Sequence, residues 1–62
     1  MTEEKLKNYK NYIQKRLKGI DFYLSSITLK GNNEMFLKQI RNYVEDIDMA
    51  TSHMQYTEKK GI

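Results

Sequence analysis

Apolar residues in the first half of the chain recur in steps of three and four, which is the period of an α-helix. Thr2 is a suitable N-cap for this helix, and Glu3 and Glu4 favour the positive end of its dipole. The pattern therefore predicts a helix over residues 3–30. Its apolar stripe, with a heptad repeat of Leu and Ile at its centre, consists of Leu6, Tyr9, Ile13, Leu17, Ile20, Leu24 and Ile27.

A second apolar stripe with the same period follows the only strong turn signal, Gly31-Asn32-Asn33. Gly31 can adopt the left-handed backbone conformation that often ends an α-helix, and Asn33 is suited to be the N-cap before Glu34. We expect a turn at 31–33, a helix over 34–58 and a short basic tail at 59–62. The second stripe consists of Phe36, Ile40, Tyr43, Ile47, Ala50 and Met54, and Leu37 and Val44 widen one of its edges.

These elements predict an all-α fold in which residues 1–62 form a single domain, an antiparallel two-helix hairpin. Gly19 leaves an alternative open, because a glycine inside a helix costs about 1 kcal/mol relative to alanine. A break at Gly19 with Asp21 as the next N-cap would produce three helices. The heptad series keeps its phase from Ile13 through Ile20 to Ile27, which favours one continuous helix.

The small size of the chain predicts that it associates with another chain. A domain of about 60 residues buries only about 60% of the surface that its unfolded chain exposes, and no cysteine is present to form a disulfide. We therefore expect a homodimer in which two hairpins form a four-helix bundle. Tyrosine and arginine are enriched at interfaces, and one edge of the first stripe offers candidates for the dimer interface: Tyr9, Tyr12, Arg16 and Tyr23.

Phe22 and Leu29 fall on the side of a continuous first helix that lies opposite its apolar stripe. In one interpretation the chain bends at Gly19 or frays toward Gly31, so that both side chains fold back into the core. In another they form an exposed contact patch for a second protein, because large apolar groups on a polar face are typical of such sites. Scattered exposure without a function is the third interpretation.

The positive charge of the chain, +3 in total, is concentrated in its first half. Residues 1–30 hold seven basic and three acidic residues, whereas residues 31–62 hold four and five. A basic helix face can follow the phosphates of a nucleic acid. The residues that would do so are Lys7, Lys15, Arg16 and Lys18. A membrane surface is a weaker hypothesis, since the neighbouring apolar stripe is needed for folding.

The sequence contains few residues of the types that catalyse reactions or bind metals. The chain has one histidine, His53, and no cysteine, so a nucleophile, a base and an orienting group cannot be gathered in a pocket. Asp46 and His53 share a helix edge, but no motif supplies the further ligands of a metal site. We expect no enzymatic activity, no cofactor and no metal. The absence of a long apolar run predicts a cytoplasmic protein.

The sequence thus predicts a small regulatory protein that binds and modulates another protein, for example as an inhibitor, through a helical surface. The partner-binding residues would be Phe22, Leu29 and Lys18, with Lys15 and Lys7 adding complementary charge. The competing hypothesis is a small dimeric nucleic-acid-binding regulator that uses the basic face. Frequent Lys, Asn, Ile and Tyr would suit the AT-rich genome of a bacterium or phage.

Overall fold

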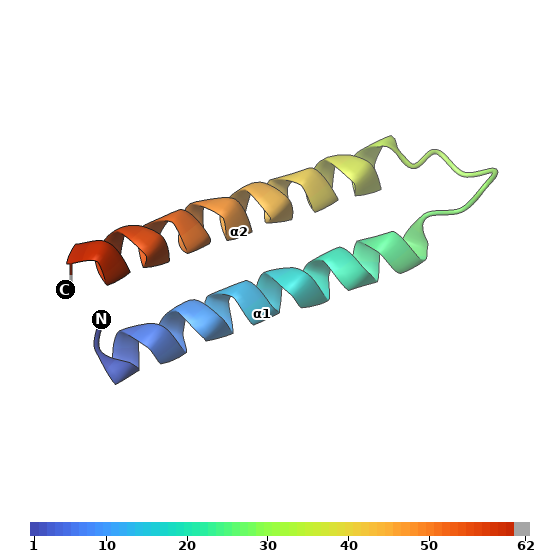
Figure 1. Cartoon of the computed structure of the whole chain (residues 1–62). Helices are drawn as coiled ribbons and strands as arrows, with labels where there is room; N and C mark the ends of the chain where they lie inside the picture. Colours follow the sequence, from blue (N-terminus) through green and yellow to red (C-terminus); the bar gives the residue numbers. More distant parts are fainter. Residues whose placement is uncertain (61–62) are drawn as a thin grey trace.

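The computed structural model describes residues 1–60, which form two antiparallel helices joined by a loop (Figure 1). Helix α1 spans Glu3–Ser26 and helix α2 spans Glu34–Lys60. The Cα atoms extend over 51 × 16 × 11 Å, so the molecule is a flat rod two helices wide. The predicted all-α hairpin is confirmed.

The start of α1 follows the expected capping pattern. The Thr2 Oγ1 atom accepts a hydrogen bond of 3.2 Å from the Lys5 backbone N–H, and the Thr2 carbonyl accepts one of 3.0 Å from the Leu6 N–H. Glu3 and Glu4 occupy the first turn, where their charge is favourable. The cap fixes where the first stripe begins.

Helix α1 ends at Ser26, four residues before the predicted end at residue 30. The hydroxyl groups of Ser25 and Ser26 donate to the carbonyls of Asp21 and Phe22, at 2.9 and 3.0 Å. Ile27 then takes an extended conformation, with φ −73° and ψ 130°. Serine and β-branched residues are weak helix formers, which explains the early end.

The loop is closed by side-chain hydrogen bonds and contains no left-handed glycine. Asn33 bridges back to Thr28: its Oδ1 accepts from the Thr28 N–H at 3.2 Å, and its Nδ2 donates to the Thr28 carbonyl at 2.7 Å. Asn32 Oδ1 accepts from the Glu34 N–H at 3.3 Å. Among residues 1–60 no glycine has a positive φ, so the left-handed helix end expected at Gly31 is wrong.

Helix α2 begins at the predicted residue and continues two residues beyond the predicted end, so that Lys59 lies in the helix. The Leu37 N–H donates to the Asn33 carbonyl at 2.9 Å, which is the first hydrogen bond of the helix. The end of the expected basic tail, residues 61–62, lies outside the described residues.

Gly19 lies inside a continuous α1, as the unbroken heptad phase predicts. The side chain of Tyr43 lies directly against it. A Cβ atom built on Gly19 would stand 2.7 Å from both Cε2 and Cζ of Tyr43, closer than real Cβ contacts allow. The glycine therefore makes room for a tyrosine of α2 and does not break the helix.

The core between the helices is thin. Among the described residues only Ala50 is buried, at 7% exposure. The other residues of the seam, by which we mean the stripe positions that face the opposite helix, are half-buried, whereas Leu17 and Leu24 are exposed. The accessible surface of the chain is 5534 Å², whereas a compact monomer of 7.5 kDa would expose about 4,200 Å². Each helix covers only the apolar stripe of the other helix, so much of the remaining apolar surface stays in contact with solvent.

Candidate partner-binding surfaces

Phe22 and Leu29 lie at the loop end of the hairpin and are exposed. Phe22, four residues before the end of α1, is 65% exposed, and its ring meets the Tyr23 ring edge to face, with centroids 5.3 Å apart. Leu29 lies in the loop and is 98% exposed. Neither side chain folds back into the core, because α1 continues through Gly19 and the loop carries Leu29 away from the seam.

The lysines predicted to help bind a partner are all exposed on α1. Lys18 and Phe22 are four residues apart, so they are neighbours on the helix surface, and Lys15 is one heptad before Phe22. Lys7 lies roughly 22 Å from Phe22 along the helix axis. The structure therefore brings Phe22 and Lys18 together, and it leaves Lys7 near the other end of α1.

Tyr9, Arg16 and Tyr23, predicted for the dimer interface, face α2 within the same chain and are half-buried there. The Arg16 guanidinium lies 4.0 Å from the centre of the Tyr12 ring, a cation–π contact, and its Nε donates to Asp46 Oδ2 at 3.4 Å.

The Tyr23 ring packs against two aromatic rings of α2. The distances between ring centroids are 5.9 Å to Phe36 and 6.0 Å to Tyr43. This edge of the first stripe is thus part of the packing inside the hairpin. Arg16 is consequently directed toward Asp46, away from the three lysines with which it was expected to bind a nucleic acid.

A third surface joins residues that the sequence pattern assigns to the first stripe, Leu17 and Leu24, with the two that widen the edge of the second, Leu37 and Val44. Leu17 and Leu24 follow the heptad a positions of α1 by four residues, and Leu37 and Val44 hold the corresponding position of α2. In antiparallel helices these e positions lie on the same side of the seam. The four side chains, which we call the leucine–valine face, are each 50% to 59% exposed.

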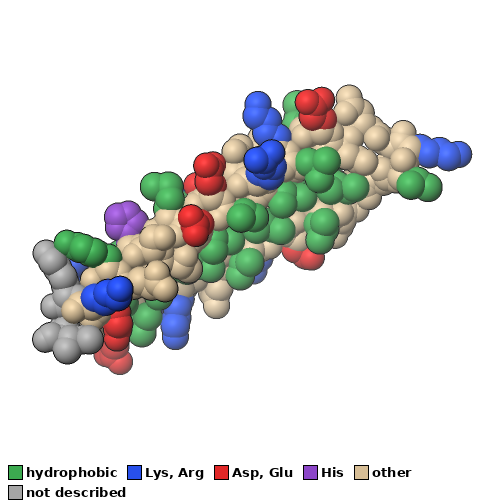
Figure 2. Space-filling model, turned by 45° about the horizontal axis from the view of Figure 1, so that its top comes forward, with side chains coloured by type: hydrophobic (Ala, Val, Ile, Leu, Met, Phe, Trp, Pro, Cys, Tyr) green, Lys and Arg blue, Asp and Glu red, His purple; other side chains and the backbone are tan. Residues whose placement is uncertain are grey.

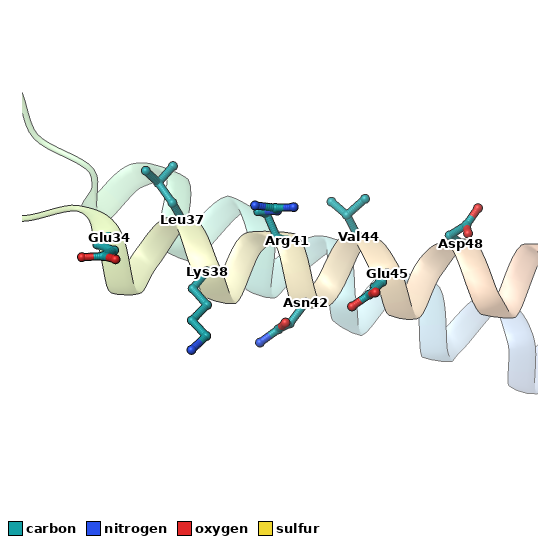
Figure 3. A pocket seen from close by; sticks show the side chains of 8 residues that line it. All are labelled: Glu34, Leu37, Lys38, Arg41, Asn42, Val44, Glu45 and Asp48. Atoms are coloured by element: carbon teal, nitrogen blue, oxygen red, sulfur yellow. The ribbon is translucent and has the colours of Figure 1, made fainter.

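Figure 2 shows hydrophobic side chains gathered along the hairpin, with acidic and basic side chains around them. A shallow depression on α2 borders the leucine–valine face (Figure 3). There Leu37, Arg41, Val44 and Asp48 point to one side, and Lys38, Asn42 and Glu45 point to the other. The signal in the sequence was the spacing of these apolar residues, which cannot say whether the e position is covered.

The opposite edge of the hairpin carries a second shallow depression, lined among others by Tyr12, Asp46, Met49 and His53. No group of three or more potential metal ligands occurs within residues 1–60. In that part of the chain, neither helix is apolar enough over a sufficient length to cross a lipid bilayer.

Comparisons of the chain with protein-family models, with curated proteins and with solved structures found no match.

Proposed function

We propose that this chain is a small non-enzymatic regulatory protein that binds another protein through the loop end of its hairpin. The observation that carries the proposal is the exposure of two large apolar side chains, Phe22 and Leu29, at that end, with the cationic Lys18 four residues before Phe22 on α1. Large exposed apolar groups with a charged rim are typical of protein-binding sites.

The chemistry of this surface indicates what the partner offers. Phe22 and Leu29 would fill an apolar pocket, since aromatic anchors supply most of the energy at such contacts. Lys18 and Lys15 would face acidic residues at the rim, where charge mainly accelerates association. Binding would modulate the partner by covering the surface that the hairpin occupies.

The protein acts, in this proposal, as a homodimer whose two hairpins form a four-helix bundle. The thin core and the large accessible surface support this, because a second hairpin would cover apolar side chains that one hairpin leaves exposed. The loop end and its Phe22 and Leu29 would stay outside the bundle.

The experiment is capture of the partner on immobilised protein from a lysate of the source organism, followed by titration with the purified partner. Phe22→Ala combined with Leu29→Ala should abolish capture and leave the helical circular dichroism unchanged. Met49→Ala is the matched control, since Met49 is also an exposed apolar residue but lies on α2, away from the loop. Undiminished binding by the double variant would remove the loop end as the binding surface.

The second candidate function is nucleic-acid binding. It is favoured by the lysines of α1, which form no ion pair within the described residues. Within residues 1–60 the one ion pair joins Arg16 and Asp46, so Lys7, Lys15 and Lys18 are unpaired cations along α1. The test is fluorescence anisotropy with a labelled RNA hairpin and a DNA duplex over a range of salt concentrations. Each phosphate contact should contribute about −0.9 to the logarithmic salt slope.

Changing the three lysines to glutamine should flatten this slope if a nucleic acid is the ligand. An intact slope in the triple variant, or no binding by the unmodified protein at low salt, would eliminate the nucleic-acid function. Nuclease treatment of the lysate before capture separates the two candidates further, because it removes only a partner that is held through nucleic acid.

A further inference from the structure

We propose that the leucine–valine face is the surface through which two copies of the hairpin pack, with both loops at the same end of the dimer. The inference rests on the proposed homodimer and adds which face is used and how the copies are oriented. It is carried by the position of two charged residues, Asp21 and Arg41, on either side of that face.

The register of the two helices fixes which residues lie level with each other. Arg16 is paired with Asp46, and Gly19 contacts Tyr43. In both pairs the residue numbers add up to 62. Leu17 with Val44 and Leu24 with Leu37 add up to 61, within one residue of this register, so the four apolar side chains form one continuous patch.

Asp21 and Arg41 lie at the same level along the hairpin, since their numbers follow the same register. Each follows a heptad a position by one residue, which places it at the outer edge of the leucine–valine face. Both are exposed, and neither has an ion-pair partner in the described chain. At this level of the hairpin, the face therefore has a negative charge on its α1 edge and a positive charge on its α2 edge.

Two hairpins can stack by this face about two kinds of twofold axis. An axis parallel to the helices keeps the loops at one end and places α1 of one copy over α2 of the other. Asp21 then lies against Arg41 of the partner subunit, and this favourable pair forms twice. Opposite charges at the rim of an interface favour association and fix its orientation.

An axis perpendicular to the helices would instead put the loops at opposite ends and stack each helix on its own copy. With the apolar patches aligned, Asp21 would lie near the partner subunit's Asp21. Arg41 would lie near the partner subunit's Arg41. Like charges in these positions disfavour this arrangement, so the charge pattern points to the first axis.

The area available agrees with what a stable dimer needs. The broad side of the hairpin, which includes the leucine–valine face, extends over 51 Å by 16 Å between Cα atoms, a projected area of roughly 800 Å² that is similar to the surface each partner buries in a standard interface. Contact over this whole side would also cover much of the accessible surface that the monomer exposes in excess of a compact protein of its mass.

The first test is analytical ultracentrifugation of the full chain at micromolar concentration. Leu24→Glu should weaken dimerisation about 100-fold, as expected for an interface hot spot, because it places a charge within the apolar patch. Met49→Glu is the matched control: Met49 is 60% exposed against 59% for Leu24, but it lies on the opposite edge of the hairpin, and its change should leave the dimer intact.

The second test exchanges the two edge charges, and it remains informative if the Leu24→Glu variant does not fold. Asp21→Arg alone and Arg41→Asp alone should each weaken the dimer, because each creates two like-charge contacts. The double variant should associate as the unmodified protein does, and an equimolar mixture of the two single variants should form a heterodimer. Unchanged dimerisation of both single variants would overturn the proposed arrangement.

The third test measures the distance between the two loops in the dimer. Because the chain has no cysteine, Lys30→Cys provides a single site for a nitroxide spin label. Double electron–electron resonance should give a distance of about 10 to 20 Å, because stacked helices lie about 10 Å apart. Lys30 lies about ten residues beyond the centre of the leucine–valine face, so loops at opposite ends would place the two labels roughly 30 Å apart. A distance of about 30 Å or more would overturn the proposed orientation.

The outcomes separate this inference from the proposed function. A monomer at every concentration would overturn both the inference and the proposed dimer, and partner capture would still test the loop end. A dimer that tolerates Leu24→Glu and the charge changes would overturn the inference alone.

Discussion

Replacing Gly19 with alanine adds a single methyl group at the place where Tyr43 lies against the backbone of α1. The new Cβ atom would stand 2.7 Å from two ring atoms of Tyr43 and 3.1 Å from its hydroxyl oxygen. Tyr43 is not free to turn away without loss, because its ring also packs on Tyr23 at a centroid distance of 6.0 Å. The substitution thus sets helix propensity against packing.

The two effects have opposite signs and comparable sizes. Alanine in place of a mid-helix glycine stabilises the helix by about 1 kcal/mol. Overpacking at a tight contact costs about 1 to 3 kcal/mol. We expect Gly19→Ala to lower the free energy of unfolding by between zero and about 2 kcal/mol, although propensity alone would raise it.

The control is the same substitution in a Tyr43→Leu background, which removes all three of the contacting atoms. There Gly19→Ala should stabilise the protein by about 1 kcal/mol, so the double-mutant cycle should give a coupling of about 1 to 3 kcal/mol. The four variants are compared by urea unfolding followed by circular dichroism, at one fixed protein concentration because association shifts the midpoint. Equal stabilisation by alanine in both backgrounds would refute the packing role of Gly19.

Three further changes test the capping, the loop and the ion pair. Thr2→Ala should cost about 1 kcal/mol of stability by removing the N-cap, and Thr2→Ser should not, as urea unfolding would show. Asn33→Ala removes both hydrogen bonds to Thr28 and should cost about 1 to 3 kcal/mol; an unchanged unfolding midpoint would mean that the loop does not depend on them. A double-mutant cycle on Arg16 and Asp46 should give a coupling below about 1 kcal/mol, since the pair is partly exposed, and a value several-fold larger would contradict this assignment.

The helical hairpin could be predicted because the apolar period and the caps agree. The a positions of α1 and the corresponding positions of α2 meet in the seam as the spacing predicts, and Thr2 caps α1 as expected. The end of α1 could not be predicted from the apolar period, because Ile27 continues the stripe. The helix ends where Ser25 and Ser26 bond back to the preceding turn and Asn33 holds Thr28 in the loop.

The candidate surfaces could be predicted only in part, because exposure depends on how many helices surround each position. Phe22 was correctly placed opposite the stripe, but the position of Leu29 depended on where α1 ends. Leu17 and Leu24 have the same apolar character as Ile13 and Ile20, and only the packing of two helices shows that the e position stays half exposed. The role of Gly19 likewise needed the position of Tyr43.

The two ends of the described chain lie beside each other at the end of the hairpin away from the loop (Figure 1). A fluorescent protein, a biotin tag or a surface tether joined at either end would therefore stand most of the 51 Å length of the rod from Leu29. Such fusions should leave the loop end accessible, which makes immobilised sensors and reporters in living cells practical formats for screening the partner.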